Sequence, residues 1–313
     1  MRYPRGVHLT RSLVIVLGSA SVLAALIGLI QLVSVWVGIE ADADMGWFFL
    51  ALALAILTVF GQSSSWLRRL LADEDPSAHR ARRSVVWVLV SAVILLIAGL
   101  KIGSTDTDAY KSLVFGEGGL VEWSQVIILA SACRVAWLIG ADLRGQFQSP
   151  FPHLLARGFA VILGLLLMEE LAWGQVIFGW ETPESIRSIN AQQETTLHNI
   201  GWFQDRLDLF VFLATLTLLL IVVLVPRISK RVLRRLSSQR QSLIQAIVPA
   251  SYIWPLFLLV VVLAYCVATR SFSEVIVNRD QEWGELVLYG SGLLLLLRTR
   301  ILLGPSEKKY AEF

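Results

Sequence analysis

Long apolar blocks separated by short polar segments dominate the chain. A helix needs about 20 apolar residues to cross the hydrocarbon core of a membrane, and eight blocks are of this length. They predict membrane-spanning helices near residues 12–39, 46–66, 84–102, 119–141, 154–180, 207–226, 249–268 and 284–303. The expected fold is an all-α, polytopic transmembrane helical bundle that forms one integral membrane domain over residues 1–313.

The first block follows three arginines, Arg2, Arg5 and Arg11, a pattern that also introduces cleavable signal peptides. The apolar region of a signal peptide is only about 7–15 residues long. Because residues 12–39 are apolar over a much longer stretch, they predict a retained first span.

The charge of the connecting segments alternates along the chain. Residues 66–84 and 226–242 are rich in arginine, whereas residues 40–46 and 104–119 are poor in it. Arginine-rich loops of membrane proteins face the cytoplasm, so both termini are expected to be cytoplasmic. These basic loops lie beside spans and lack interleaved aromatic residues, so no nucleic-acid partner is expected.

Composition agrees with the membrane assignment. Hydrophobic residues make up 56% of the chain and charged residues only 16%, whereas about a quarter of the residues in a typical soluble domain are charged. Two connecting segments have patterns of their own. Residues 181–206 predict an outer re-entrant or interfacial segment in which Thr182 caps a short helix that starts at Pro183. Residues 227–242 predict a cytoplasmic basic amphipathic segment on anionic lipid.

Two adjacent carboxylates, Glu169 and Glu170, stand inside the predicted fifth span. If that span ends near Trp180, a rise of 1.5 Å per residue places Glu169 about 16 Å below its outer end, close to the middle of the membrane. An ionised carboxylate there costs at least about 2.5–3.5 kcal/mol, so both groups need partners or a hydrated cavity. Adjacent helical residues point about 100° apart, so the two are expected to meet different neighbours.

Other polar side chains gather on the same side of the predicted membrane. They suggest a hydrated outer cavity, roofed by residues 181–206, that binds a substrate. The candidate substrate-binding residues are Glu122, Trp173, Gln175, Asn190, Gln193, Glu194, Asn199 and Glu285. Three of them have a simpler alternative: Glu122 and Glu285 fit first-turn positions favoured by the helix dipole, and Trp173 fits an interfacial belt.

The chemistry that these residues favour is acid–base catalysis at the outer leaflet. Two close carboxyl groups ionise in succession, so one donates a proton while the other accepts one. The candidate catalytic residues are Glu169, Glu170 and His198, and His198 has the alternative of a hydrogen-bonded interfacial histidine. The expected function is a hydrolase or transferase acting on a lipid-linked substrate. A proton- or cation-coupled transporter or channel, and a membrane scaffold subunit, remain alternatives.

The strings "GEGGLVEWSQ" (116–125), "EELAWGQVIFGWETPESIRSINAQQETTLHNI" (169–200) and "EWGELVLYG" (282–290) together resemble a group of uncharacterised bacterial multi-pass membrane proteins. That group has the signature E-E-x-x-W-G-Q, E-T-P and N-x-Q-x-E-x-x-L-H-N. The resemblance implies one functional unit, without an assigned activity. The expected location of the chain is the bacterial cytoplasmic (inner) membrane. The unit comprises Glu122, Glu169, Glu170, Trp173, Gly174, Gln175, Glu181, Asn190, Gln193, Glu194, His198 and Asn199.

A looser similarity is to intramembrane lipid hydrolases of the ceramidase-like superfamily, which bind zinc through three histidines. Of the four histidines here, His8, His79 and His153 fall on the predicted cytoplasmic side, which leaves only His198 outside. A three-histidine zinc site is therefore not expected within one chain. A divalent ion held by Glu169, Glu170 and His198 is left open, as are other cofactors. Membrane lipid is the expected partner, and the oligomeric state is undetermined.

Overall fold

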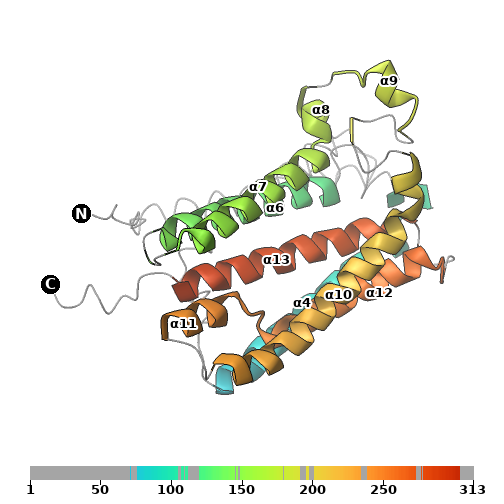
Figure 1. The fold of residues 1–313 in the computed structure, drawn as a ribbon. Helices are drawn as coiled ribbons and strands as arrows, with labels where there is room; N and C mark the ends of the chain where they lie inside the picture. Colours follow the sequence, from blue (N-terminus) through green and yellow to red (C-terminus); the bar gives the residue numbers. More distant parts are fainter. Residues whose placement is uncertain are drawn as a thin grey trace, which may run out of the picture.

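A computed structural model gives the three-dimensional structure of the chain (Figure 1). It describes residues 71, 76–104, 107–108, 110–111, 120–144, 146, 149–178, 180–190, 195–196, 201–233, 238–272, 276 and 278–303. These residues are helical, without strands, and six stretches among them are long and apolar enough to cross a membrane. The described part of the chain is therefore that of an all-helical, multi-pass membrane protein.

Six long helices account for most of the described residues. They are α4 (Pro76–Gly103), α6 (Leu120–Leu143), α7 (Phe151–Glu170), α10 (Gly201–Leu233), α12 (Trp254–Ala268) and α13 (Gln281–Leu303). Short helical segments connect them: η1 (Ala172–Gly174), α8 (Gln175–Phe178), α9 (Glu184–Arg187), α11 (Ser238–Ile247), η2 (Ser251–Ile253) and η3 (Asn278–Asp280). The six spans predicted after residue 83 are each confirmed as helices, whereas the predicted spans 12–39 and 46–66 lie outside the described residues.

Two predicted boundaries are wrong. The fifth span was expected to run to residue 180, but α7 ends at Glu170 because the next turn of the chain is left-handed. The sixth span was expected to end near residue 226, but its helix, α10, continues through Pro226 to Leu233. Proline removes one backbone donor and kinks a helix without always ending it.

The long helices pack in two groups on either side of α13. Helices α6 and α7 lie on one side of α13, and α4, α10 and α12 lie on the other (Figure 1). Consecutive long helices run in opposite directions. Because α13 contacts both α6 and α12, it is the central element of the described bundle.

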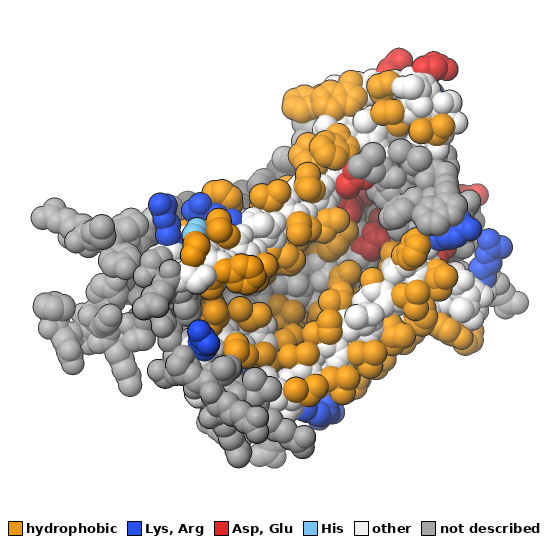
Figure 2. Space-filling model, in the orientation of Figure 1, with side chains coloured by type: hydrophobic (Ala, Val, Ile, Leu, Met, Phe, Trp, Pro, Cys, Tyr) orange, Lys and Arg blue, Asp and Glu red, His pale blue; other side chains and the backbone are white. Residues whose placement is uncertain are grey.

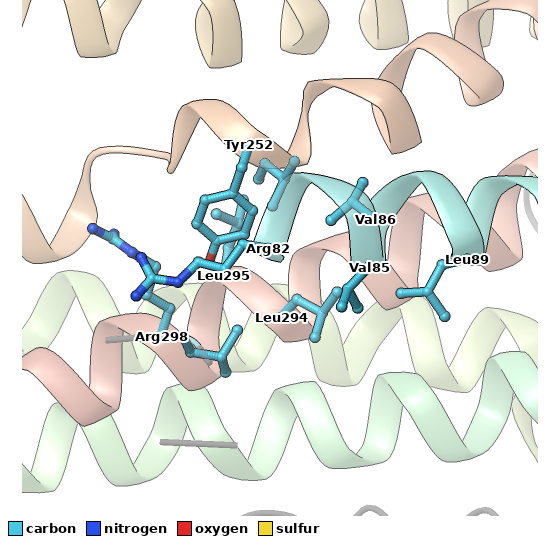
Figure 3. Close-up of a pocket in the computed structure, with 10 residues that line it drawn as sticks. Arg82, Val85, Val86, Leu89, Tyr252, Leu294, Leu295 and Arg298 are labelled. Atoms are coloured by element: carbon cyan, nitrogen blue, oxygen red, sulfur yellow. The ribbon is translucent and has the colours of Figure 1, made fainter. Parts of the chain in front are cut away.

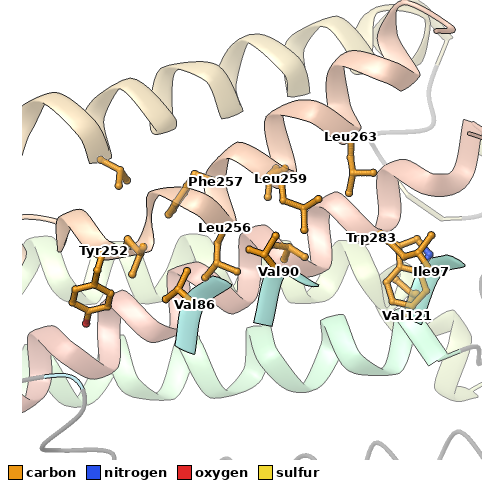
Figure 4. Close-up of a cluster of buried hydrophobic side chains, with 14 of the residues drawn as sticks. Val86, Val90, Ile97, Val121, Tyr252, Leu256, Phe257, Leu259, Leu263 and Trp283 are labelled. Carbon is orange, nitrogen blue, oxygen red and sulfur yellow. The ribbon is translucent and has the colours of Figure 1, made fainter. Parts of the chain in front are cut away.

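Two apolar clusters fill the spaces beside α13. One lies between α4, α12 and the first half of α13 and includes Val90, Phe257 and Trp283 (Figure 4). The other lies between α6, α7 and the second half of α13 and includes Leu129 and Leu163. Since lipid tails are as apolar as these side chains, close packing rather than the hydrophobic effect holds such helices together.

The contact between α6 and α7 shows this close packing directly. A Cβ atom on Gly140 would stand 2.8 Å from Cγ of Arg157 and 3.2 Å from the carbonyl oxygen of His153. Along the same interface, the Cys133 thiol donates to the carbonyl oxygen of Ala160 at 3.2 Å. The two helices therefore form a tight pair that only a glycine at position 140 permits.

The two ends of the bundle differ in charge. One end, formed where α6, α10 and α13 finish and α4, α7 and α12 begin, carries many arginines and is called the arginine end below. Its described members include Arg82, Arg144, Arg157, Arg227, Arg298 and Arg300. The opposite end, called the acidic end, carries Glu169, Glu170, Asp208, Glu282 and Glu285.

We expect Gly140→Val to destabilise the protein by about 1–3 kcal/mol, because overpacking a close interface forces side chains and backbone apart. Gly158→Val is the matched control, since nothing lies within 4 Å of a Cβ at that position of α7. The measurement is the unfolding midpoint in detergent micelles. Equal midpoints for the two variants would contradict the close α6–α7 contact.

Candidate functional site

Shortly after Glu170 the backbone leaves the right-handed helical conformation and adopts a left-handed one. Ala172, Trp173 and Gly174 have φ angles of 45°, 56° and 99°, in the left-handed region that costs a residue with a side chain about 1–2 kcal/mol. A Cβ on Gly174 would stand 2.9 Å from Cη2 of Trp180, so glycine is required there for space as well as for conformation. This elbow ends the span and turns the chain into α8.

The elbow places both glutamates at the carboxyl-terminal end of α7 rather than in the middle of a longer helix. The continuous helix from Glu169 to Trp180, on which the predicted depth of about 16 Å was based, is therefore not formed. A helix carries partial negative charge at this end, which is unfavourable for carboxylates. Each glutamate has a donor: Trp173 Nε1 donates to Glu169 Oε1 at 2.7 Å, and Tyr289 Oη donates to Glu170 Oε1 at 2.8 Å.

These two hydrogen bonds confirm that the glutamates meet different neighbours. The bond to Glu169 is local, because the left-handed turn folds the indole of Trp173 back by four residues. The bond to Glu170 joins α7 to α13 across 119 residues of sequence. Only Glu170 is therefore directed toward the centre of the bundle.

The first turns of α13 supply the groups that face Glu170. Gln281, Glu285 and Tyr289 are spaced four residues apart and so share one face of the helix. Gln281 Nε2 donates to Glu285 Oε1 at 2.7 Å, and the neighbouring Glu282 accepts from Arg279 Nη2 at 3.1 Å. Glutamate is favoured here, since the amino-terminal end of a helix is positive.

These acids lie close enough to one another to repel when ionised. Glu170 is near Glu282, and Glu285 is near Glu282, Glu170 and Asp208 at the start of α10. Arg270, in the turn that follows α12, carries the opposite charge and attracts the Asp208 carboxylate. The acidic cluster, defined here as Glu170, Asp208, Glu282 and Glu285, thus draws on α7, α10 and α13.

Acidic side chains stand at one end of a hollow in the molecular surface. Figure 2 shows this hollow between α7 and α10, with apolar side chains along its borders and acidic side chains at the end nearer α8. Glu170, Glu282 and Glu285 are partly exposed, and Asp208 is exposed. An apolar hollow with a few convergent polar groups at one end is the usual form of a small-molecule or lipid site.

The described residues that follow α8, 181–190 and 195–196, are held by hydrogen bonds of their own. Gln175 Oε1 accepts from Thr182 Oγ1 at 3.2 Å and from the Thr195 amide at 3.0 Å. Asn190 Nδ2 donates to the carbonyl oxygen of Thr196 at 2.9 Å. The predicted cap at Thr182 is wrong, because Pro183 occupies the N-cap position of α9 and the Thr182 hydroxyl binds Gln175 instead.

A buried ion pair positions the start of α13. Lys101, at the end of α4, pairs with Asp280, whose side chain has no exposed surface. Tyr110 Oη donates to Asp280 at 2.7 Å and accepts from Trp283 Nε1 at 2.9 Å. Burial raises the pKa of the Tyr110 hydroxyl, so it remains a protonated donor. This network, called the Lys101–Asp280 network, attaches α13 to α4.

The predicted site residues have different outcomes in the structure. Glu170 and Glu285 come together, whereas Glu169 bonds to Trp173. Glu122 lies in the first turn of α6, as the dipole interpretation expects, but Glu285 lies beyond the first turn of α13 and has other contacts. Gln175 and Asn190 hold the segment that follows the elbow, and their roles in substrate binding stay predictions. The positions of Gln193, Glu194, His198 and Asn199 lie outside the described residues.

Sequence reasoning missed Tyr289 and Asp208 as members of the site. The four-residue spacing from Gln281 through Glu285 to Tyr289 was a usable signal, because it places three polar side chains on one face of an otherwise apolar helix. No comparable signal marked Asp208, since an acid at the start of a span is ordinary. Among the described residues, no group of three histidine, cysteine or acidic side chains is arranged to hold a metal ion.

Comparisons with known protein families, curated proteins and solved structures found no match to this chain. The interpretation of the site therefore depends on its residues and their geometry.

Asp280→Asn should destabilise the protein by about 3–5 kcal/mol, because it leaves the Lys101 ammonium without its charged partner in a buried position. Asparagine keeps the size of the side chain and an oxygen that accepts from Tyr110. Asp108→Asn is the control: Asp108 pairs with Lys111 but its side chain is 95% exposed, and such pairs contribute about 0–1 kcal/mol. Denaturant unfolding in micelles measures both, and equal stabilities would show that the buried pair is not needed.

Proposed function

We propose that this protein is a membrane-embedded hydrolase or transferase that acts on an amphiphilic, lipid-linked substrate at the acidic end of the bundle. The observation that carries the proposal is the pairing of Glu170 with Tyr289, next to Glu285, at the end of an apolar hollow. Glu170 and Glu285 are the catalytic groups of this proposal. His198 and Glu169 keep the roles predicted from sequence only as a second choice.

The proposed chemistry uses the two carboxyl groups in complementary protonation states. The ionised group removes a proton from water or from an acceptor hydroxyl, whose oxygen attacks the acyl or phosphoryl centre. The protonated group gives its proton to the departing oxygen, so the bond broken and the bond formed balance. Such acid–base assistance contributes about 10²–10⁴-fold to a rate. The Tyr289 hydroxyl, bonded to Glu170, orients that carboxyl group.

The borders of the hollow favour entry of the substrate from the lipid phase. Exposed apolar side chains on the two bordering helices include Leu165 and Leu166 on α7 and Leu209 and Leu213 on α10. A lipid tail can contact such surfaces while its polar group reaches the acids. This arrangement supports an amphiphilic substrate over a small soluble one.

Among amphiphilic substrates, the cations near the acidic end support one that contains a phosphate group. Lys101 is bound to Asp280, Lys111 to Asp108 and Arg187 to Glu181, so these three are occupied by carboxylates. Arg279 is likewise bound to a carboxylate, that of Glu282. Arg270, beside Asp208, is therefore the cation that supports this choice, because an arginine suits the phosphate of a phospholipid or polyprenyl phosphate.

A proton- or cation-coupled transporter is the second candidate, supported by the same cluster of intramembrane acids. It requires a polar path to the arginine end. Along α13 toward that end, the buried polar side chain is Ser291, which donates to the Val287 carbonyl, and Leu293 and Leu297 are apolar. The described residues therefore favour a site with access from one side. The excess of arginine at the opposite end supports an outward-facing acidic end.

We expect Glu170→Gln and Glu285→Gln each to reduce turnover at least about 100-fold, since each removes one member of the acid–base pair. Glu169→Gln is the matched control and should keep activity within about threefold, because its bond is to Trp173 and any effect comes through the elbow. The assay incubates reconstituted protein with vesicles containing phosphatidylglycerol, phosphatidylethanolamine or a polyprenyl diphosphate and follows product formation by mass spectrometry.

Turnover that survives in Glu170→Gln, or that is lost equally in Glu169→Gln, would refute the assignment of the pair. A parallel measurement on the same vesicles follows the decay of an imposed pH gradient. Decay that depends on Glu170 in the absence of lipid conversion would favour the transporter.

A further inference from the structure

A second site lies at the arginine end, far from the acidic cluster along α13. It is a pocket between α4, η2 and α13, formed by Arg82, Val85, Leu89, Tyr252, Leu294 and Arg298 with their neighbours (Figure 3). The two guanidinium groups lie toward one end of the pocket, and Leu89 lies toward the other. Leu89 is 43% exposed, so the pocket opens along the lipid-facing side of α4.

The polar end of the pocket is built from three elements. The guanidinium carbon of Arg82 lies 5.7 Å from the centre of the Tyr252 ring. Arg298 Nη1 donates to the carbonyl oxygens of Ala246 and Val248, at 3.3 Å and 3.0 Å, at the end of α11. Both arginines act electrostatically on the Tyr252 hydroxyl, and Figure 3 shows the three side chains toward the same end of the pocket. Two fixed cations and a hydroxyl group therefore converge at one place.

The depth of these groups corresponds to the interfacial region of a membrane. Arg82 begins the apolar stretch Arg82–Gly103, and Arg298 lies five residues before the end of α13 at Leu303. At 1.5 Å per residue, Arg298 is about 7.5 Å inside its helix end, a level that lipid phosphates and glycerol groups reach. Basic pockets between spans at this level are suited to anionic lipid head groups.

We propose that this pocket is a binding site for an anionic phospholipid. Its phosphate lies on Arg82 and Arg298, with the Tyr252 hydroxyl as a further donor. The pocket itself has a volume of about 40 Å³ and takes only a short part of one acyl chain, so the rest of the chain lies on the exposed surface of α4 at Leu89. Charge complementarity selects an anionic lipid, and the exposed apolar surface of α4 favours a lipid over free phosphate. The bound lipid would connect α4, α12 and α13 where Arg298 also holds α11.

The test is lipid titration followed by native mass spectrometry on the delipidated full-length protein. Wild type should bind dioleoylphosphatidylglycerol about tenfold more tightly than dioleoylphosphatidylcholine, as expected for charge-assisted hydrogen bonds to the head group. Arg82→Gln should remove this preference. Arg83→Gln is the matched control, because it makes the same change in charge at the neighbouring, exposed position and should keep the preference.

Leu89→Trp tests the apolar end of the pocket independently. It also provides a test of the site if the Arg82→Gln variant does not fold. It should weaken binding of phosphatidylglycerol by at least about tenfold, and millimolar inorganic phosphate should not displace the lipid from wild type. Equal loss of preference in Arg82→Gln and Arg83→Gln, unchanged binding in Leu89→Trp, or displacement by phosphate alone would each overturn the proposal. A melting curve in detergent confirms that each variant is folded before titration.

Discussion

The buried ion pair between Lys101 and Asp280 is the interaction on which the acidic end depends. It joins the end of α4 to the start of α13, two positions separated by 179 residues of sequence, and Tyr110 and Trp283 complete its hydrogen bonds. A buried charge is tolerated only when it is paired and hydrogen-bonded. Because Asp280 directly precedes α13, the pair fixes where that helix begins and, through it, the rotation that presents Glu285 and Tyr289 to Glu170.

The two sides of the hollow are held differently. On one side, α7 is fixed to α6 by the close approach at Gly140 and to α13 by the bond between Tyr289 and Glu170. On the other side, α10 packs mainly against α12, where Phe212 contacts Tyr265. The α7 border of the hollow is therefore fixed to two other helices. The other border is α10, which contains Pro226 near the arginine end.

Sequence predicted the overall architecture better than the site. Six described helices follow from apolar length alone, since a membrane requires whole helices with their backbone groups satisfied internally, and the gathering of acids at one end follows from the charge of the loops. The end of α7 did not follow, because the left-handed conformations of Ala172 and Trp173 leave no trace in hydropathy. Long-range pairs such as Tyr289 with Glu170 depend on helix rotation, which a single sequence does not determine.

The elbow after α7 also changes the meaning of the string "EELAWGQ" (169–175). Within it, Glu169 and Trp173 bond to each other, Gly174 provides the conformation and the space that the turn needs, and Gln175 holds the segment that follows. Glu170 reaches another helix, through its bond to Tyr289 of α13. Most of this motif therefore encodes a shape, and a search for the same string in other genomes would collect proteins that share the elbow whether or not they share a reaction.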